Sequence, residues 1–264
     1  MTPPLVRFRE KVCVITGAAQ GIGLATARRL AAEGAALALV DLHRPGVESA
    51  ARELRADGAD VEAMVVDVSD AAATAAAVES VVARFGRVDV LVNNVGGTRQ
   101  IKPFELYTAE EMRAEVDRSL WTALVCCHAV LPRMLEQGSG SIVNVGSNSP
   151  RGIYRVPYAA AKGGVFALTT SLSAEVARRG VRVNCVAPGA TRVDDRAVPR
   201  MTEEQERENG RWIEELFSSQ ETIVPMGRWG SVDEQAAAIA FMASDDASFV
   251  TGQVLSVAGG LTVP

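Results

Sequence analysis

Apolar and polar positions follow one another in blocks along the chain. Short β-branched, strand-length runs alternate with longer Ala-rich stretches. The short runs predict seven strands, at 12–16, 37–41, 61–66, 88–93, 141–145, 181–186 and 253–257. The longer stretches predict helices at 22–33, 46–57, 70–85, 109–137 and 157–179.

Strands separated by helices of this length predict an α/β fold. We expect a single-domain, Rossmann-type doubly wound parallel sheet of about seven strands with helices on both faces. No linker or change of composition divides residues 1–264, so one domain is expected. Segment 191–225 departs from this rhythm because it is polar, carries Arg192, Arg196 and Arg200, and continues as an acidic helix from Glu203. We expect it to cover the site as a mobile lid.

Composition narrows the class of protein. Hydrophobic residues make up 48% of the chain and aromatic residues only 5%, which suits an aliphatic core of strands buried on both faces. A net charge of -5 argues against a nucleic-acid partner. No apolar run approaches the ~20 residues of a membrane span, and the N-terminus lacks a signal-peptide pattern. A cytoplasmic protein is therefore expected.

The cysteines and histidines do not form a metal-binding pattern. Cys13, Cys126, Cys127 and Cys185 lie in apolar stretches without a Cys-x-x-Cys pair. They are typical of small core residues in a reducing compartment. Only two histidines occur, so no transition-metal site is expected.

A glycine-rich turn joins the first predicted strand to the first predicted helix. It contains Gly17, Gln20, Gly21, Ile22 and Gly23 in the order Gly-x-x-x-Gly-x-Gly. Glycines allow the backbone to approach a pyrophosphate, and a helix N-terminus favours its charge. The spacing differs from Gly-x-Gly-x-x-Gly, and no Lys-Ser or Lys-Thr follows as in nucleoside triphosphatases. The turn is either a dinucleotide site or a plain strand-to-helix connection, and its place after the first strand favours the former.

Two acidic residues at strand ends bear on the choice of cofactor. Asp41 ends the second predicted strand, where a carboxylate can accept hydrogen bonds from the adenosine ribose and repels a 2′-phosphate. NAD is therefore expected rather than NADP, although His43 and Arg44 follow closely. Asp67 and Val68 end the third strand, and either border the adenine or belong to a helix N-cap region before Asp70.

Tyr158 and Lys162 are four residues apart in a predicted helix and so share one face. A fixed cation near a phenol favours the phenolate, which suits general base catalysis. A Tyr and a Lys at this spacing are common on ordinary helices, so the pair gains its meaning from the surrounding motifs.

Together these motifs resemble the short-chain dehydrogenase/reductase family. The matching residues run in the family's order over nearly the whole chain: Thr16-Gly17-x-x-x-Gly21-Ile22-Gly23, Asn93-Asn94-Val95-Gly96, Ser147, Tyr158-x-x-x-Lys162, Pro188-Gly189 and Thr251-Gly252-Gln253 to Gly259-Gly260. The resemblance implies Tyr158 as acid/base, Lys162 as ligand of the nicotinamide ribose, and Ser147 as hydrogen-bond partner of the reacting oxygen. It further implies a homotetramer and a cofactor lined by Asn93, Asn94, Gly96, Pro188, Gly189 and Thr191.

The chain departs from the family pattern at three places. Ser119 stands where an Asn usually helps to hold a proton-relay water, and a hydroxyl offers fewer contacts than an amide. Ser147 and Tyr158 are eleven residues apart, which is shorter than the common interval. Val193 stands where a Thr is common, which leaves Thr191 as the nearest hydroxyl.

Other stretches resemble one subgroup, the benzoate cis-diol dehydrogenases. They are Asn94-Val95-Gly96-Gly97-Thr98, Cys126 to Pro132, Arg155-Val156-Pro157-Tyr158 and Asp233 to Ile239. The subgroup oxidises 1,6-dihydroxycyclohexa-2,4-diene-1-carboxylate to catechol with release of CO2. Such a small carboxylated cis-diol needs a cation, and we expect Arg155 or Arg192 first, with Arg99 and Arg151 also bordering the pocket.

Two other functions stay open at this point. The same scaffold serves reductases of 3-oxoacyl thioesters and alcohol dehydrogenases, which Asp41 disfavours where NADPH is required. The chain could also be an idle NAD-binding regulator, but such a protein has no need of the acid/base set Ser147, Tyr158 and Lys162.

Overall fold

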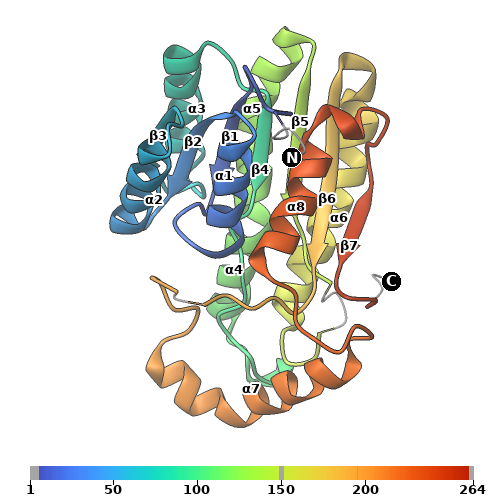
Figure 1. The fold of residues 1–264 in the computed structure, drawn as a ribbon. Helices are drawn as coiled ribbons and strands as arrows, with labels where there is room; N and C mark the ends of the chain where they lie inside the picture. The colour runs from blue at the N-terminus through green and yellow to red at the C-terminus, as the bar shows by residue number, and fades with distance from the viewer. Residues whose placement is uncertain (1–5, 149–151, 195, 262–264) are drawn as a thin grey trace.

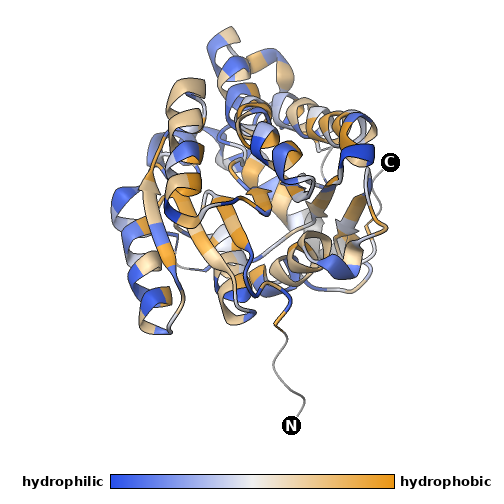
Figure 2. Ribbon diagram, turned by 90° about the horizontal axis from the view of Figure 1, so that it is seen from above, coloured by the Kyte–Doolittle hydropathy of each residue, from blue (hydrophilic) through white to orange (hydrophobic). Residues whose placement is uncertain are grey.

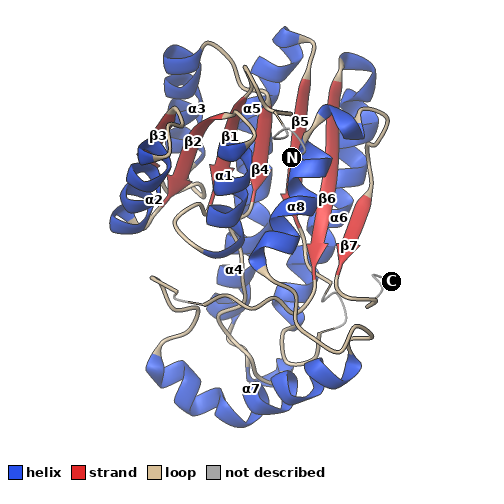
Figure 3. Ribbon diagram, in the orientation of Figure 1, coloured by secondary structure: helices blue, strands red, loops and turns tan. Residues whose placement is uncertain are grey.

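The computed structural model describes residues 6–148, 152–194 and 196–261 and contains a seven-stranded sheet in the order β3-β2-β1-β4-β5-β6-β7 (Figure 1). Every neighbouring pair of strands is parallel, so all arrows in Figure 3 point the same way. The strands are β1 (Val12–Thr16), β2 (Ala36–Asp41), β3 (Val61–Val65), β4 (Val90–Asn93), β5 (Gly140–Val145), β6 (Val181–Pro188) and β7 (Val254–Val257). The predicted Rossmann-type sheet is confirmed.

Helices cover both faces of the sheet. They are α1 (Gly21–Ala32), α2 (Arg44–Ala56), α3 (Ala71–Phe85), α4 (Ala109–Val116), α5 (Thr122–Gln137), α6 (Val156–Val176), α7 (Glu203–Ile223) and α8 (Val232–Ala243). One apolar cluster joins the sheet to α1, α2 and α8, and a second joins its other face to α3, α5 and α6. Figure 2 shows the apolar strands between helices whose outer surfaces are polar. Burial on both faces explains the nearly continuous aliphatic strands.

The strand order reverses direction between β1 and β4, which makes this the switch point of the sheet. Strand-end residues from both halves meet there, at the edge where ligands bind in doubly wound folds. Helix α7 lies beyond this carboxyl edge, below the strands in Figure 1. The polar segment 191–225 is thus placed on the side of the sheet that carries the predicted site.

The predicted helix over 109–137 is present, but it is not a regular α-helix throughout. A π-helical turn at Asp117–Trp121 separates α4 from α5. Such turns widen the helix by one residue and often occur at functional sites. This turn contains the buried Ser119, one of the predicted site residues. Periodicity does not reveal a one-residue insertion, since the apolar pattern continues on both sides.

Helix α8 was not among the predicted helices. It begins with a capping box in which the Ser231 hydroxyl accepts from the Glu234 N–H and the Glu234 carboxylate accepts from the Ser231 N–H. The Ser-x-x-Glu spacing ahead of an apolar run is a helix-start signal that could have found it.

The cysteines lie in the core as predicted. All four are buried free thiols, and burial raises the pKa of Cys127 and of Cys185 to about 12. They are therefore poor nucleophiles. Within the described ranges, no group of His, Cys, Asp and Glu side chains could hold a metal ion, and no helix is long and apolar enough to cross a bilayer.

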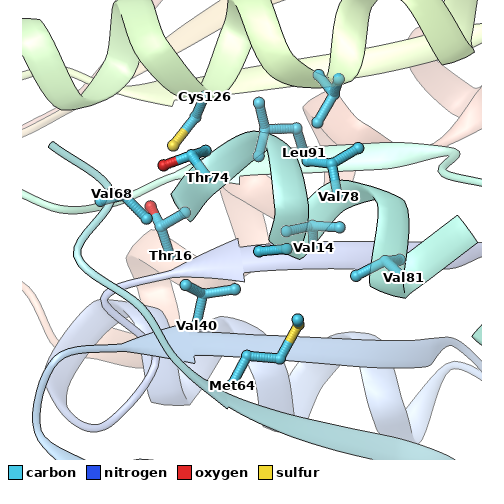
Figure 4. Close-up of a pocket in the computed structure, with 12 residues that line it drawn as sticks. Val14, Thr16, Val40, Met64, Val68, Thr74, Val78, Val81, Leu91 and Cys126 are labelled. Atoms are coloured by element: carbon cyan, nitrogen blue, oxygen red, sulfur yellow. The ribbon is translucent and has the colours of Figure 1, made fainter. Parts of the chain in front are cut away.

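An apolar cavity of about 20 Å³ lies between α3, α5 and the sheet (Figure 4). It is lined by aliphatic side chains from β1 to β4 together with Thr16, Thr74 and Cys126. Its volume is about that of one water molecule, so it is a packing gap and no ligand site.

Candidate active site

The glycine-rich loop is shaped by contacts that leave no room for side chains. Gly17 and Gly21 have φ angles of 65° and 58°, which favour glycine. A Cβ on Gly23 would lie 2.1 Å from the Gly17 carbonyl oxygen, so α1 can pack against the loop only with glycine there. Gln20 is the N-cap of α1 and makes no side-chain cap hydrogen bond among described residues. The loop thus presents a helix N-terminus to an anion.

Asn94 anchors this loop to the end of β4. Its side-chain amide donates to the carbonyl oxygens of Thr16 (3.2 Å) and Gly17 (3.0 Å), and its backbone N–H donates to the Thr16 hydroxyl. Asn93 points elsewhere: its buried amide donates to the Asn144 side chain at 2.9 Å. Asn93 therefore supports the β4–β5 pair, while Asn94 shapes the loop.

Asp41 lies at the same edge, beside the loop. Its Oδ2 accepts the Ala19 N–H at 3.0 Å and its Oδ1 accepts the His43 N–H at 2.9 Å. The carboxylate is thus fixed next to the glycine loop, as an adenosine-ribose ligand requires.

Asp67 is exposed after β3 and accepts hydrogen bonds from the Ser69 N–H and hydroxyl, which lower the pKa of Asp67. The N-cap of α3 is Asp70, which accepts from the N–H groups of Ala72 and Ala73. Asp67 therefore shapes the turn that leads into this helix, and Val68 beside it is buried.

Lys162, Gly96 and Ser119 come together from three elements. The Lys162 ammonium is buried and donates to the Val145 carbonyl oxygen, at the end of β5, at 2.6 Å. A Cβ on Gly96 would lie 2.9 Å from Lys162 Nζ and 3.6 Å from Ser119 Oγ. The Ser119 hydroxyl is buried and has no hydrogen-bond partner among the described residues. A buried orphan hydroxyl beside an ammonium is a place where a water can be held.

Tyr158 lies in the first turns of α6 with its side chain largely buried. The Lys162 ammonium is 6.0 Å from the centre of its ring, and the Arg155 guanidinium carbon is 5.9 Å from the same point. Ser147 is buried two residues beyond Val145, the residue whose carbonyl oxygen binds Lys162. The end of β5 and the start of α6 thus place Ser147, Tyr158 and Lys162 at one edge of the sheet.

The segment after β6 lies over the glycine loop. Gln20 binds Val198 on both sides: its amide donates to the Val198 carbonyl oxygen at 3.1 Å and its Oε1 accepts the Val198 N–H at 2.9 Å. A Cβ on Gly21 would lie 3.4 Å from Val193. Pro188 ends β6, and Gly189 can approach Ala258 only because it has no side chain. The Thr191 hydroxyl donates to the Gly189 carbonyl oxygen.

The predicted arginines take different positions. Arg155 is half-buried beside Tyr158, whereas the side chains of Arg192 and Arg99 are exposed. Arg151 lies outside the described residues. Segment 191–225, called the capping segment below, contains a further arginine to which sequence reasoning gave no role. This residue, Arg200, is also exposed and lies beside Gly97, where a Cβ would be 3.6 Å from its Nε. The only sequence signal for it is the spacing of Arg192, Arg196 and Arg200.

A buried carboxylate organises the loop after β4. Glu115 Oε1 accepts the N–H groups of Arg99 (2.6 Å) and Gln100 (3.0 Å), and burial raises the pKa of Glu115. Glu115 lies in α4, in the helix predicted over 109–137, and nothing in the sequence pattern distinguished it.

Comparison with known proteins gives this arrangement a family. The family profile described as Enoyl-(Acyl carrier protein) reductase matches residues 17–262. A Pseudomonas putida protein named 1,6-dihydroxycyclohexa-2,4-diene-1-carboxylate dehydrogenase is 50% identical over 96% of this chain and 93% of its own length. The protein of the same name from Acinetobacter baylyi is 46% identical over 96% of this chain and 97% of its own length. The chain belongs to the short-chain dehydrogenase/reductase family.

Solved structures agree with this membership of the short-chain dehydrogenase/reductase family. A crystal structure of levodione reductase matches with a TM-score of 0.88 and 39% identity, over 96% of this chain and 98% of that one. The structure of an NAD+-bound xylitol dehydrogenase matches with a TM-score of 0.86 and 33% identity, over 96% of this chain and all of that one. The protein is thus an oxidoreductase, and its family works with nicotinamide cofactors.

The residues present fit such a cofactor. The glycine loop leaves a helix N-terminus for the pyrophosphate, and Asp41 is fixed beside it. Gly96, where a side chain would collide with Lys162, keeps the backbone clear next to the ammonium.

Proposed function

We propose that the protein oxidises 1,6-dihydroxycyclohexa-2,4-diene-1-carboxylate to catechol, with release of CO2 and reduction of NAD. The observation that carries this proposal is the nearly full-length identity of 46–50% to two dehydrogenases named for that substrate. The position of Arg155 beside Tyr158 supports it, because this substrate brings a carboxylate to the reacting phenol.

In the proposed mechanism Tyr158 is the general base. It takes the proton of the secondary alcohol, and the buried ammonium of Lys162 lies on the same helix face, 6.0 Å from the centre of the Tyr158 ring. Ser147 donates a hydrogen bond to the reacting oxygen and so holds the alcohol in line with Tyr158. A nicotinamide cofactor held at this edge of the sheet would supply the acceptor for the hydride of the carbinol carbon.

The cofactor in this proposal is NAD. Gly17, Gln20, Gly21, Ile22 and Gly23 would hold its pyrophosphate, and the fixed carboxylate of Asp41 would accept the ribose hydroxyls and repel a 2′-phosphate. The remaining contacts would come from Asp67, Val68, Asn94, Gly96, Pro188, Gly189 and Thr191.

Ser119 is proposed as part of the proton path. Its unpartnered hydroxyl beside Lys162 can hold a water that receives the proton from the Tyr158 side of the site. It would replace the amide that is usual in the family with a single hydroxyl.

Oxidation makes decarboxylation possible without a further catalyst. Loss of the alcohol proton and of hydride leaves a ketone β to the carboxylate. The C–C bond to the carboxylate then breaks, its electron pair forms the enolate, and protonation of the enolate gives catechol. Arg155 is proposed to bind the carboxylate before this step, because its guanidinium carbon lies 5.9 Å from the centre of the Tyr158 ring.

A homotetramer in the cytoplasm is proposed as the working form. Large apolar side chains are exposed on the π-helical turn, α5, α8 and the turn before β7, as an interface would require: Trp121, Leu124, Phe241 and Phe249. Four buried free thiols suit a reducing compartment.

The experiment is an assay of NADH formation with the purified protein, NAD and the benzoate cis-diol. We expect turnover with NAD, weak turnover with NADP, and a loss of at least about 100-fold in Tyr158→Phe, since a positioned base contributes roughly 10²- to 10⁴-fold. Full activity of Tyr158→Phe, or no turnover of the diol by the unaltered protein, would overturn the proposal.

A further inference from the structure

Two arginines of the capping segment form no ion pair with any carboxylate of the described residues. Arg196 and Arg200 take part in none of the ion pairs formed between described residues. Arg196 is half-buried, and burial together with the neighbouring charge of Arg200 lowers its pKa to about 10. Arginines held near one another without an acidic partner are an arrangement that an anion stabilises.

Arg200 reaches the loop after β4, at Gly97, which follows Gly96 beside Lys162. Its Nε lies 3.6 Å from the position that a Cβ on Gly97 would take. A Cβ on the adjacent Gly96 would lie 2.9 Å from Lys162 Nζ. The Lys162 ammonium therefore lies beside Gly96, and the Arg200 guanidinium lies beside the next residue, Gly97.

Arg155 lies on the Tyr158 side of the site. It immediately precedes α6, and its guanidinium carbon is 5.9 Å from the centre of the Tyr158 ring. Burial lowers the pKa of Arg155, and the charge of Arg200 lowers it further. Arg200 therefore lies close enough to Arg155 for their charges to interact, on the side of the site where Tyr158 lies.

We propose that Arg200 and Arg155 together bind the carboxylate of the substrate, with Arg200 supplied by the capping segment. This inference rests on the proposed function and names the group that selects carboxylated cis-diols. A guanidinium on each side of one carboxylate satisfies both oxygens with charge-assisted hydrogen bonds.

The experiment compares two variants on two substrates. Arg200→Gln removes the charge, and Arg207→Gln, an exposed arginine of α7 in the same segment, is the matched control. Each is assayed with the 1-carboxylate diol and with cis-1,2-dihydroxycyclohexa-3,5-diene, which has the same ring and no carboxylate. Dissociation constants for NAD are measured by quenching of protein fluorescence.

We expect Arg200→Gln to lower kcat/KM for the carboxylated diol about 10- to 100-fold, the effect of one charged hydrogen bond. Its kcat/KM for the unsubstituted diol and its affinity for NAD should match those of Arg207→Gln. Equal losses on both diols, no loss on either, or weaker binding of NAD would overturn the inference, the last because Arg200 would then face the cofactor phosphates. If the unaltered protein oxidises neither diol, the proposed function itself fails.

Discussion

Gly96 controls how closely the backbone after β4 approaches the Lys162 ammonium. Its φ of 156° and the 2.9 Å between its absent Cβ and Lys162 Nζ leave little tolerance for any other residue. Lys162 cannot simply move away, because its ammonium is also bound to the Val145 carbonyl oxygen. Position 96 therefore requires glycine, because any side chain there would collide with Lys162.

Gly96→Ala should lower kcat/KM roughly 10- to 100-fold, because a displacement of about 1 Å in a catalytic group has an effect of this size. The control is Gly58→Ala, where φ is also positive but nothing lies within 4 Å of the added carbon. Steady-state kinetics of the two variants test this, and equal activity in both would contradict the role of Gly96.

Glu115 makes stability depend on pH. Burial raises the pKa of this carboxyl in the folded protein above its unfolded value. Its contribution to stability is therefore fully present below the ordinary glutamate pKa, about 4.3, and is lost as the pH rises through the raised value.

Glu115→Gln keeps an acceptor for the Arg99 and Gln100 N–H groups but cannot ionise. As the pH rises above about 4.3, the ordinary glutamate pKa, we expect the melting temperature of this variant to fall less than that of the unaltered protein. Glu105→Gln, at an exposed position, should follow the unaltered protein. Parallel curves for all three proteins would show that the charge of Glu115 is not destabilising.

At the scale of elements, the capping segment is tied to the glycine loop by one side chain. The two hydrogen bonds between Gln20 and Val198 join residues 178 positions apart. Gln20 was predicted as a cofactor-binding residue, and the structure adds this second contact. The contact links the cover of the site to the loop that would bind the pyrophosphate.

Gln20→Ala should make the segment at 191–225 more sensitive to protease, about tenfold if each hydrogen bond contributes about 1 kcal/mol and part of this is recovered by water. NAD and substrate should slow cleavage of the unaltered protein. Gln253→Ala, which loses one exposed hydrogen bond within its own turn, serves as control. Cleavage at the same rate with and without ligands would contradict the lid.

The elements also mark the limit of sequence reasoning. The strands and most helices could be predicted from the sequence. Strands buried on both faces are nearly continuous aliphatic runs, and the Ala-rich stretches between them are helices. The π-helical turn at Asp117–Trp121 could not, because one inserted residue barely changes the apolar pattern. Helices and strands were predicted correctly where the apolar pattern extends over the whole element.

At the scale of the whole molecule, parallel strands bring motifs from residues 17 to 189 to one edge of the sheet. The glycine loop, Asp41 and the Tyr158/Lys162 pair could be predicted because each has a fixed place in that topology. Arg200 could not, since its position depends on how an irregular segment folds back over β4. The place of these residues at one edge of the sheet was thus readable from the sequence, while the position of Arg200 required the structure.

In the proposed reaction, one oxidation leads directly to loss of the carboxylate. The most direct test is to quantify NADH, catechol and CO2 in the same reaction of the purified protein with NAD and 1,6-dihydroxycyclohexa-2,4-diene-1-carboxylate. We expect the three products to appear in equal amounts and all to be lost in Tyr158→Phe. NADH formed without catechol and CO2, or no NADH from this diol, would contradict the account.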